Sequence, residues 1–212
     1  PTTSASASSY CTMSAGDPNK APKGCLLYEL PFPDRARLSD LFSKMMPDCL
    51  LAIDQGGIER NAHVTVGYGF SPEIEVEDEL AALLAETKPI SLAFGELGKF
   101  EAPTHVCLHA QVISPEMVDL HYRIRGYFGD KFKCTHPNFH PHATVAYLKK
   151  SPEAEQFVGD MRLSGETFLA RELVYSVDRG GKRCRRTFVL GQPVLSESVS
   201  RFLAAGTKMQ FV

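Results

Sequence analysis

Two short segments of the chain share one pattern of residue types. His63-Val64-Thr65-Val66-Gly67-Tyr68 and His142-Ala143-Thr144-Val145-Ala146-Tyr147 both follow the order His-x-Thr-Val-x-Tyr. A single His-x-Thr carries little information, because threonine is common in strands. Two copies followed by the same residue types are hard to obtain by chance, and they indicate one site built from both segments.

Side chains two residues apart in a β-strand lie on the same face of the sheet. Each copy is therefore expected to present a histidine, a threonine and a small residue on one face. The expected sets are His63, Thr65 and Gly67 in the first copy and His142, Thr144 and Ala146 in the second. The small residues would leave space for a bound substrate beside the polar groups, whereas Tyr68 and Tyr147 would face the core.

Two imidazoles and two hydroxyls around one point suit the cleavage of a phosphodiester. With a pKa of about 6.5, one imidazole can take a proton from the attacking hydroxyl or water, and the other can donate one to the leaving oxygen. Each such transfer typically accelerates a reaction by about 10²–10⁴. Threonine hydroxyls can donate hydrogen bonds to the non-bridging oxygens. We therefore predict His63, Thr65, His142 and Thr144 as catalytic residues, with no metal or other cofactor.

The composition favours a small or short phosphate ester over a long nucleic acid. The 212 residues carry a net charge of −2, whereas a protein that follows a long nucleic acid usually has a basic excess. No apolar run approaches the roughly 20 residues that cross a bilayer, so no membrane partner is expected. The six cysteines form no C-x-x-C pair and predict reduced thiols in the cytoplasm. The oligomeric state is left open.

The order of apolar patterns predicts an α+β fold. Residues 1–23 are expected to be a flexible N-terminal segment, 24–195 a bilobal domain, and 196–212 a C-terminal helix or tail. Hairpin-like strand pairs favour largely antiparallel sheets, and the repeated motif favours two pseudo-symmetric lobes with flanking helices around a central cleft. Strands are expected at 24–30, 49–53, 63–68, 90–100, 104–113, 142–148, 168–177 and 184–190, and helices at 35–46, 76–86, 114–128 and 152–161.

The paired motifs resemble the 2H phosphoesterase superfamily, which is marked by two His-hydrophobic-Thr-hydrophobic strands. Further segments are similar to a phage anti-CBASS subgroup of that superfamily, over roughly residues 24–190. These segments are Leu27-Tyr28-Glu29-Leu30-Pro31, Met46-Pro47-Asp48, the stretch from Ala62 to Gly69, Gly98-Lys99-Phe100, and the stretch from Pro141 to Tyr147.

The subgroup implies cleavage of 3',5'-linked cyclic oligonucleotide signals, which blocks the antiphage response in the cytoplasm of a host cell. In that mechanism the ribose 2'-hydroxyl attacks the adjacent phosphorus, with His63 and His142 as base and acid in either order. The resemblance also implies that the two motif threonines bind phosphate and that Tyr28 stacks on a base. Subgroup members are expected to use a C-terminal tryptophan near the base. This chain has no tryptophan, so Tyr175 or another aromatic residue would have to replace it.

Other interpretations stay open at this point. The substrate could instead be a 2',3'-cyclic phosphate or a 2',5'-oligoadenylate, and a module that only binds nucleotides is an alternative to an enzyme. The cluster of His136, His140 and His142 resembles a zinc site, but no cysteine or carboxylate joins it at ligand spacing, so His140 is instead expected to line the cleft.

Two further groups of residues have no settled interpretation. His105 and His109 share one face of a strand, and they belong either to the sheet surface or to the lining of the cleft. The basic run from Lys182 to Arg186 either reaches ligand phosphates or forms a solvated turn.

Overall fold

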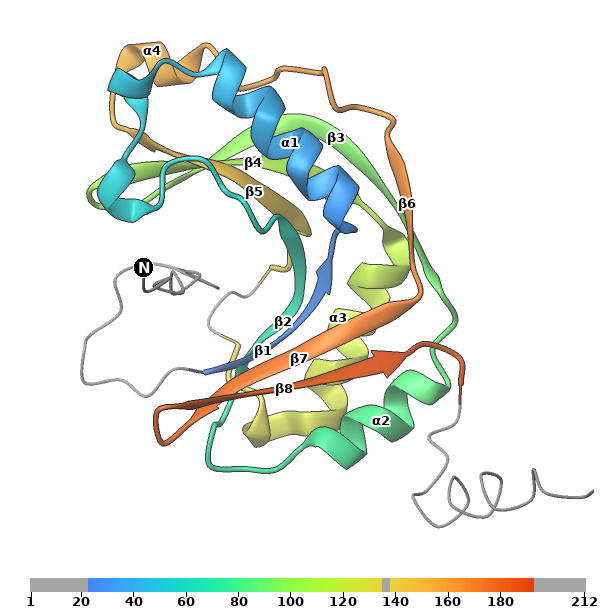
Figure 1. Cartoon of the computed structure of the whole chain (residues 1–212). Coiled ribbons are helices and arrows are strands. Elements are labelled where there is room, and N and C mark those ends of the chain that lie inside the picture. Colours follow the sequence, from blue (N-terminus) through green and yellow to red (C-terminus); the bar gives the residue numbers. More distant parts are fainter. Residues whose placement is uncertain (1–22, 135–137, 193–212) are drawn as a thin grey trace, which may run out of the picture.

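One curved antiparallel sheet of eight strands organises the residues that the computed structural model describes, 23–134 and 138–192 (Figure 1). The strand order is β6-β3-β4-β5-β2-β1-β7-β8, and every neighbouring pair is antiparallel. The strands are β1 (Gly24–Glu29), β2 (His63–Phe70), β3 (Ile90–Glu101), β4 (His105–Ile113), β5 (His142–Lys149), β6 (Thr167–Ala170), β7 (Glu172–Arg179) and β8 (Lys182–Val189). The predicted antiparallel α+β fold is confirmed.

The expected terminal segments cannot be compared with this structure. Residues 1–22 and 193–212, which include nearly all of the expected N-terminal segment and all of the expected C-terminal helix or tail, lie outside the described residues.

The sheet consists of two similar halves that meet between β5 and β2. We call β6-β3-β4-β5 the β5 half and β2-β1-β7-β8 the β2 half. Helix α1 (Phe32–Met45) follows β1 but packs against β5, and helix α3 (Pro115–Phe128) follows β4 but packs against β2 as well as β3 (Figure 1). The segments after these helices cross in the same way, because Leu51 pairs with β5 and Phe132 pairs with β2. The connections therefore interlock the two halves.

Helix α3 shows how the sequence specifies an element that supports the site. The Ser114 hydroxyl accepts a hydrogen bond from the backbone N–H of Met117 at 3.2 Å, and Pro115 occupies the first turn. The buried face repeats at helical spacing. It consists of Met117, Leu120, His121, Ile124 and Phe128. The predicted helix at 114–128 is confirmed, and this face rests against the motif strand β2.

Three predicted elements are wrong in part. The strand expected at 168–177 is divided at Arg171 into β6 and β7, which lie in different halves of the sheet. Instead of a strand at 49–53, the chain forms short 3-10 turns at Asp48–Leu50 and Ile53–Gln55, with only Leu51 bridging to β5. Such short apolar runs do not determine backbone conformation by themselves. The helix expected at 152–161 is only α4 (Pro152–Glu155), and Gly159 then adopts a φ of 82° that a helix does not allow. The remaining helix, α2 (Glu77–Ala85), lies within its predicted range.

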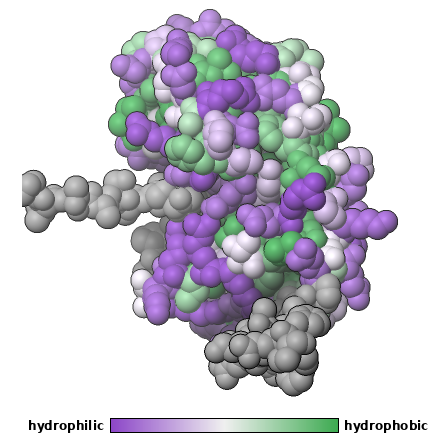
Figure 2. Space-filling view, turned by 45° about the vertical axis from the view of Figure 1, so that its right-hand side comes forward, coloured by the Kyte–Doolittle hydropathy of each residue, from purple (hydrophilic) through white to green (hydrophobic). Residues whose placement is uncertain are grey.

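The surface drawn in Figure 2 is largely hydrophilic, with apolar residues in groups between hydrophilic ones. No helix among the described residues is long and apolar enough to cross a membrane.

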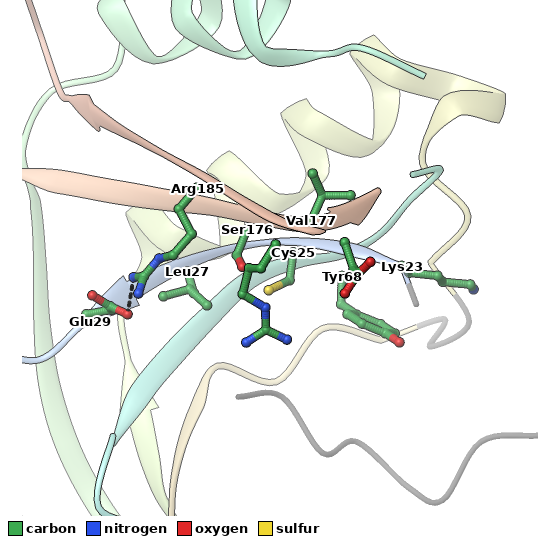
Figure 3. A pocket seen from close by; sticks show the side chains of 10 residues that line it. Lys23, Cys25, Leu27, Glu29, Tyr68, Ser176, Val177 and Arg185 are labelled. Atoms are coloured by element: carbon green, nitrogen blue, oxygen red, sulfur yellow. Dashed lines mark hydrogen bonds and ion pairs between the residues drawn. The ribbon is translucent and has the colours of Figure 1, made fainter. Parts of the chain in front are cut away.

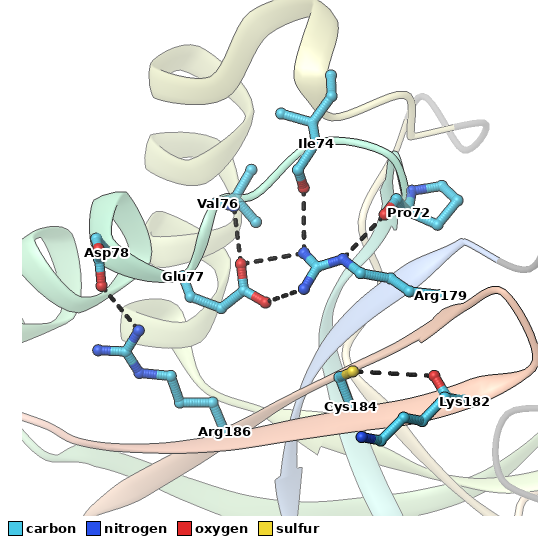
Figure 4. A network of polar contacts seen from close by, with 9 residues as sticks. All are labelled: Pro72, Ile74, Val76, Glu77, Asp78, Arg179, Lys182, Cys184 and Arg186. Carbon is cyan, nitrogen blue, oxygen red and sulfur yellow. Dashed lines mark hydrogen bonds and ion pairs between the residues drawn. The ribbon is translucent and has the colours of Figure 1, made fainter.

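A network of ion pairs holds the β7–β8 hairpin against the start of α2 (Figure 4). The Arg179 guanidinium donates to both carboxylate oxygens of Glu77, at 2.7 and 3.1 Å, and also to the backbone carbonyls of Pro72 and Ile74. Burial opposes ionisation of Glu77, but hydrogen bonds from Arg179 and the backbone outweigh it and lower the pKa of this carboxyl. A planar guanidinium is needed for this two-pronged contact, since an ammonium cannot reproduce it.

We expect Arg179→Lys to lower the free energy of unfolding by about 1–2 kcal/mol, because the paired hydrogen bonds to Glu77 and the contacts with the two carbonyls are lost together. Urea unfolding measures this. The matched control is Arg162→Lys, whose partner Asp160 lies two residues away and whose side chain is 43% exposed. That change should stay within about 0.5 kcal/mol. Equal effects of the two substitutions would contradict a special role for the Arg179 contacts.

Candidate active site

The two motif strands touch where the motifs begin. Val64 of β2 lies opposite Ala143 of β5, and both side chains are completely buried in the core. Alternation places the flanking histidines and threonines on the other face of the sheet, where all four are half-buried. We call this the histidine face. The structure thus brings together the four residues predicted as catalytic, His63, Thr65, His142 and Thr144.

The register sets the arrangement of these four side chains. Antiparallel geometry around the recorded pair of Val64 and Ala143 places His63 on the side of Thr144 and Thr65 on the side of His142. The two histidines are then diagonal neighbours, typically about 7–8 Å apart. A phosphate group fits between two imidazoles at that separation, with a hydroxyl next to each.

Both imidazoles are oriented by the same kind of hydrogen bond. The Nδ1 of His63 lies 2.8 Å from the backbone oxygen of Asn61, and the Nδ1 of His142 lies 2.8 Å from the backbone oxygen of His140. A carbonyl oxygen only accepts, so Nδ1 carries the hydrogen in each ring. The nitrogen that changes its protonation state is therefore Nε2 in both, as paired acid–base chemistry requires.

A β-bulge after the first motif reverses the expected alternation. Leu27 of β1 lies opposite Thr65, but the next residue, Leu26, lies opposite Gly67, which leaves Val66 as an extra residue. Gly67 consequently faces the core, where an added Cβ would meet the Phe132 ring at 3.3 Å. The prediction that Gly67 makes room for substrate on the histidine face is wrong.

The second motif carries the equivalent bulge. On β4, Leu108 lies opposite Ala146 and His109 opposite Thr144, so Val145 is the extra residue. Ala146 is fully buried in the core, and its predicted place beside the substrate is wrong.

The tyrosines that end the two motifs were predicted to face the core, but both lie on the histidine face. Tyr68 lies opposite Cys25 on the histidine face and is half-buried. Tyr147 lies opposite Cys107 on the same face, with its ring 5.7 Å from that of His105. Tyr147 is only 7% exposed, because the 51–59 segment closes over it. Of the two, Tyr68 is therefore the one that a ligand can reach.

Two other aromatic residues proposed for base stacking lie in the core instead. Tyr28 is 5% exposed and Tyr175 is 1% exposed, and both belong to the main apolar cluster. Alternation along β1 explains this, since Leu27 and Glu29 occupy the histidine face and Tyr28 lies between them. The predicted stacking role of Tyr28 is wrong, and Tyr175 cannot replace the missing tryptophan.

His109 is a neighbour of the site that the sequence left undecided. Its ring stacks on Phe100 with the centroids 4.0 Å apart, and it lies 5.2 Å from the His142 ring. Gly98 lies opposite, where an added Cβ would come within 2.8 Å of His109 Nε2. Burial, reinforced by the charge of His142, lowers the pKa of His109 to about 4. Near neutral pH, His109 is therefore uncharged, and its ring packs against that of His142.

The immediate surroundings differ between the two motifs. Glu29 lies opposite His63, whereas Gln111 lies opposite His142. The Cys107 sulfur lies 3.4 Å from the Thr144 hydroxyl, and burial raises the pKa of this thiol, so it stays neutral. His105 is also on this face, with its Nδ1 3.1 Å from the Thr104 hydroxyl.

His140 was predicted to line the cleft, and with His136 and His142 it was considered as a zinc site. The His140 side chain is exposed, while its backbone oxygen orients His142. Whether the side chain contacts substrate stays a prediction. Among residues 23–134 and 138–192, no three His, Cys, Asp or Glu side chains are grouped as metal ligands, and His136 lies outside these ranges.

We expect His109 to make the free energy of unfolding depend on pH. Its folded pKa of about 4 lies below the ordinary value of 6.5, so the unfolded chain takes up the proton first as the pH falls. The native state should therefore lose about 2 kcal/mol between pH 7.5 and pH 5 through this residue. Urea unfolding at both pH values measures the loss. His109→Gln should remove that part of the pH dependence, and an unchanged pH dependence in the variant would contradict the buried neutral histidine.

Comparison with known proteins agrees with this geometry. Residues 53–181, more than half of the chain, match the 2'-5' RNA ligase superfamily. The sequence matches no curated protein. The structure is similar to that of Escherichia coli LigT complexed with 3'-AMP, with 17% identity, a TM-score of 0.55, and coverage of 81% of this chain and 99% of LigT.

A second solved structure shows the same likeness. TT0787 of Thermus thermophilus is 18% identical, with a TM-score of 0.56 and coverage of 80% of this chain and 98% of that protein. At such identities the likeness establishes the shared fold. Together with the family match and the paired histidines, it shows that this chain belongs to the 2'-5' RNA ligase superfamily and is a phosphodiesterase of the 2H type.

Proposed function

We propose that this phosphodiesterase cleaves 3',5'-linked cyclic oligonucleotide signals and that it is a phage protein that counters CBASS immunity in its host. The observation that carries the proposal is the pair of equivalent imidazoles, each held through Nδ1 by a backbone oxygen two residues before it. This arrangement supports a reaction in which one proton is removed and another is delivered on the two sides of one phosphate.

The proposed reaction follows from these positions. The ribose 2'-hydroxyl attacks the adjacent phosphorus while Nε2 of one histidine takes its proton. The bond from phosphorus to the 5'-oxygen breaks, and the other histidine donates its Nε2 proton to that oxygen. The products are a linear oligonucleotide with a 2',3'-cyclic phosphate at one end and a 5'-hydroxyl at the other. Thr65 and Thr144, beside the opposite histidines, donate to the non-bridging oxygens, where negative charge increases.

The size and charge of the substrate are inferred from two observations. The net charge of −2 favours a ligand with few phosphates over a long strand. The LigT structure was solved with the mononucleotide 3'-AMP, which supports a small nucleotide ligand for this chain as well. The choice of a cyclic signal rests further on the segments that resemble the anti-CBASS subgroup. In these segments Glu29 and the motif histidines and threonines lie on the histidine face.

The family description favours one alternative, a 2',5'-linked substrate. A panel of 3',3'-cyclic dinucleotides and trinucleotides, 2',5'-oligoadenylate and a nucleoside 2',3'-cyclic phosphate separates the two possibilities, with EDTA present and products analysed by mass. We expect the cyclic oligonucleotides to be opened fastest. Faster cleavage of the 2',5'-linked substrate would reject the proposed function in favour of the alternative.

Substitution of either histidine should abolish turnover while binding persists. We expect His63→Ala and His142→Ala each to lower kcat by about 10²–10⁴, because each removes one proton transfer. The affinity for uncleaved substrate, measured by calorimetric titration, should change much less. The double variant should be little slower than either single variant, since the two groups act as one unit. Retention of more than a tenth of the wild-type kcat by either single variant would rule out this acid–base assignment.

The threonine hydroxyls should affect the chemical step more than ground-state binding. We expect Thr65→Val to lower kcat by about 10–10³ with little change in KM, because the hydroxyl serves the charged transition state. Thr187→Val is a matched control, since Thr187 is exposed on β8, at the far edge of the β2 half. A fall in affinity with unchanged kcat would instead assign Thr65 to substrate binding alone.

A further inference from the structure

A shallow hollow lies beside the catalytic residues on the histidine face, between β1, β2 and the β7–β8 hairpin (Figure 3). Two of its lining residues are direct strand neighbours of the motif, since Leu27 lies opposite Thr65 and Glu29 lies opposite His63. We call it the Tyr68 hollow.

The floor of the hollow is apolar although it lies outside the main core. Cys25 and Leu27 line the hollow and form a small cluster with Val174, and Tyr68 packs against this cluster. Tyr68 reaches this position only because the bulge at Val66 turns it away from the core. An apolar floor next to an aromatic ring suits a nucleobase, because every base has an apolar face that stacks on aromatic rings.

The rim of the hollow carries a net positive charge. Its cations are Lys23, Arg183 and Arg185, and its carboxylates are Glu29 and Asp178. Arg185 donates to Glu29 at 2.5 Å, at the end of the hollow beside His63. The Lys23 ammonium lies 6.0 Å from the centre of the Tyr68 ring. Because the cations outnumber the carboxylates, the rim favours an anionic group near the aromatic ring.

The basic run of β8 is divided between the two faces of the sheet. Arg183 and Arg185 lie opposite Asp178 and Ser176 in the hollow, whereas Arg186 lies on the other face and donates to Asp78 at 2.8 Å (Figure 4). Another hollow lies on that other face, around Arg179 and Arg186. The ion pairs that hold α2 to the β7–β8 hairpin cross it. Of these two hollows, the Tyr68 hollow is therefore better suited to a ligand.

We propose that the Tyr68 hollow binds the nucleotide next to the cleaved phosphate, with its base against Tyr68 and its phosphate at Arg183 and Lys23. Tyr68 follows Thr65 by three residues on β2, which at about 3.3 Å per residue places the ring about 10 Å along the strand, within reach of one further nucleotide. The proposal rests on the proposed function, because it requires a substrate with at least two nucleotides.

Binding of an uncleavable ligand tests this subsite apart from catalysis. The probe is a linear 2'-deoxy diadenylate with a 3'-phosphate, which lacks the attacking hydroxyl, and its comparison is 2'-deoxyadenosine 3'-monophosphate. Calorimetric titration should show the dinucleotide binding at least tenfold more tightly to the wild type. Tyr68→Leu and Arg183→Gln should each remove most of that advantage, while Tyr68→Phe should keep it. Equal affinities of the two probes for the wild type would overturn the proposal.

Arg186→Gln is the matched control, because it removes the same charge from the same strand on the opposite face. It should leave the advantage of the dinucleotide unchanged, and an effect as large as that of Arg183→Gln would also overturn the subsite. Thermal unfolding of each variant checks that the fold is retained.

Cleavage assays separate this proposal from the proposed function. For a cyclic dinucleotide, Arg183→Gln should raise KM at least tenfold more than it does for a nucleoside 2',3'-cyclic phosphate. If no cyclic oligonucleotide is opened but the binding advantage is found, the proposed substrate fails and the subsite stands. If cyclic oligonucleotides are opened but the variants affect both substrate classes equally, the subsite fails and the proposed function stands.

Discussion

The site depends on one contact between two strands. β2 and β5 are paired at Val64 and Ala143, and this pair sets both the face and the spacing of the two histidines. A shift of the register by one residue would move one motif to the core side, since side chains alternate along a strand. Burial of Val64 and Ala143 in the core opposes such a shift. The register of this central pair is thus protected by the same apolar packing that stabilises the fold.

The bulges at Val66 and Val145 divide each motif strand into two parts with opposite alternation. Before the bulge, the histidine and the threonine lie on the histidine face, and Val64 or Ala143 faces the core. After it, the tyrosine lies on the histidine face and the small residue faces the core. One strand can in this way supply a histidine, a threonine and an aromatic ring to the same face at positions that simple alternation forbids. Bulges often redirect side chains beside active sites in this manner.

Much of the fold and the central four residues could be predicted from the sequence, because they depend on local patterns. The repeated His-x-Thr and the capping serine at Ser114 are signals of this kind. The faces of Gly67, Ala146 and Tyr68 could not be predicted, since a bulge is defined by pairing with another strand. The position of His109 beside His142 depends likewise on the register between β4 and β5. The sequence indicated only that His105 and His109 share one face of a strand.

The crossing connections also bear on how the chain could be divided or could have arisen. Helix α1 comes from the β2 half and covers β5, while α3 follows β4 and covers β2. Neither half therefore retains all the apolar side chains that bury its own sheet. The β2 half is also discontinuous in sequence, because β3 to β6 lie between β2 and β7, so no single cut of the chain separates the two halves. A half-length chain with one motif would lack the second imidazole and the helix that covers its sheet, so the same core would require a second copy of that chain.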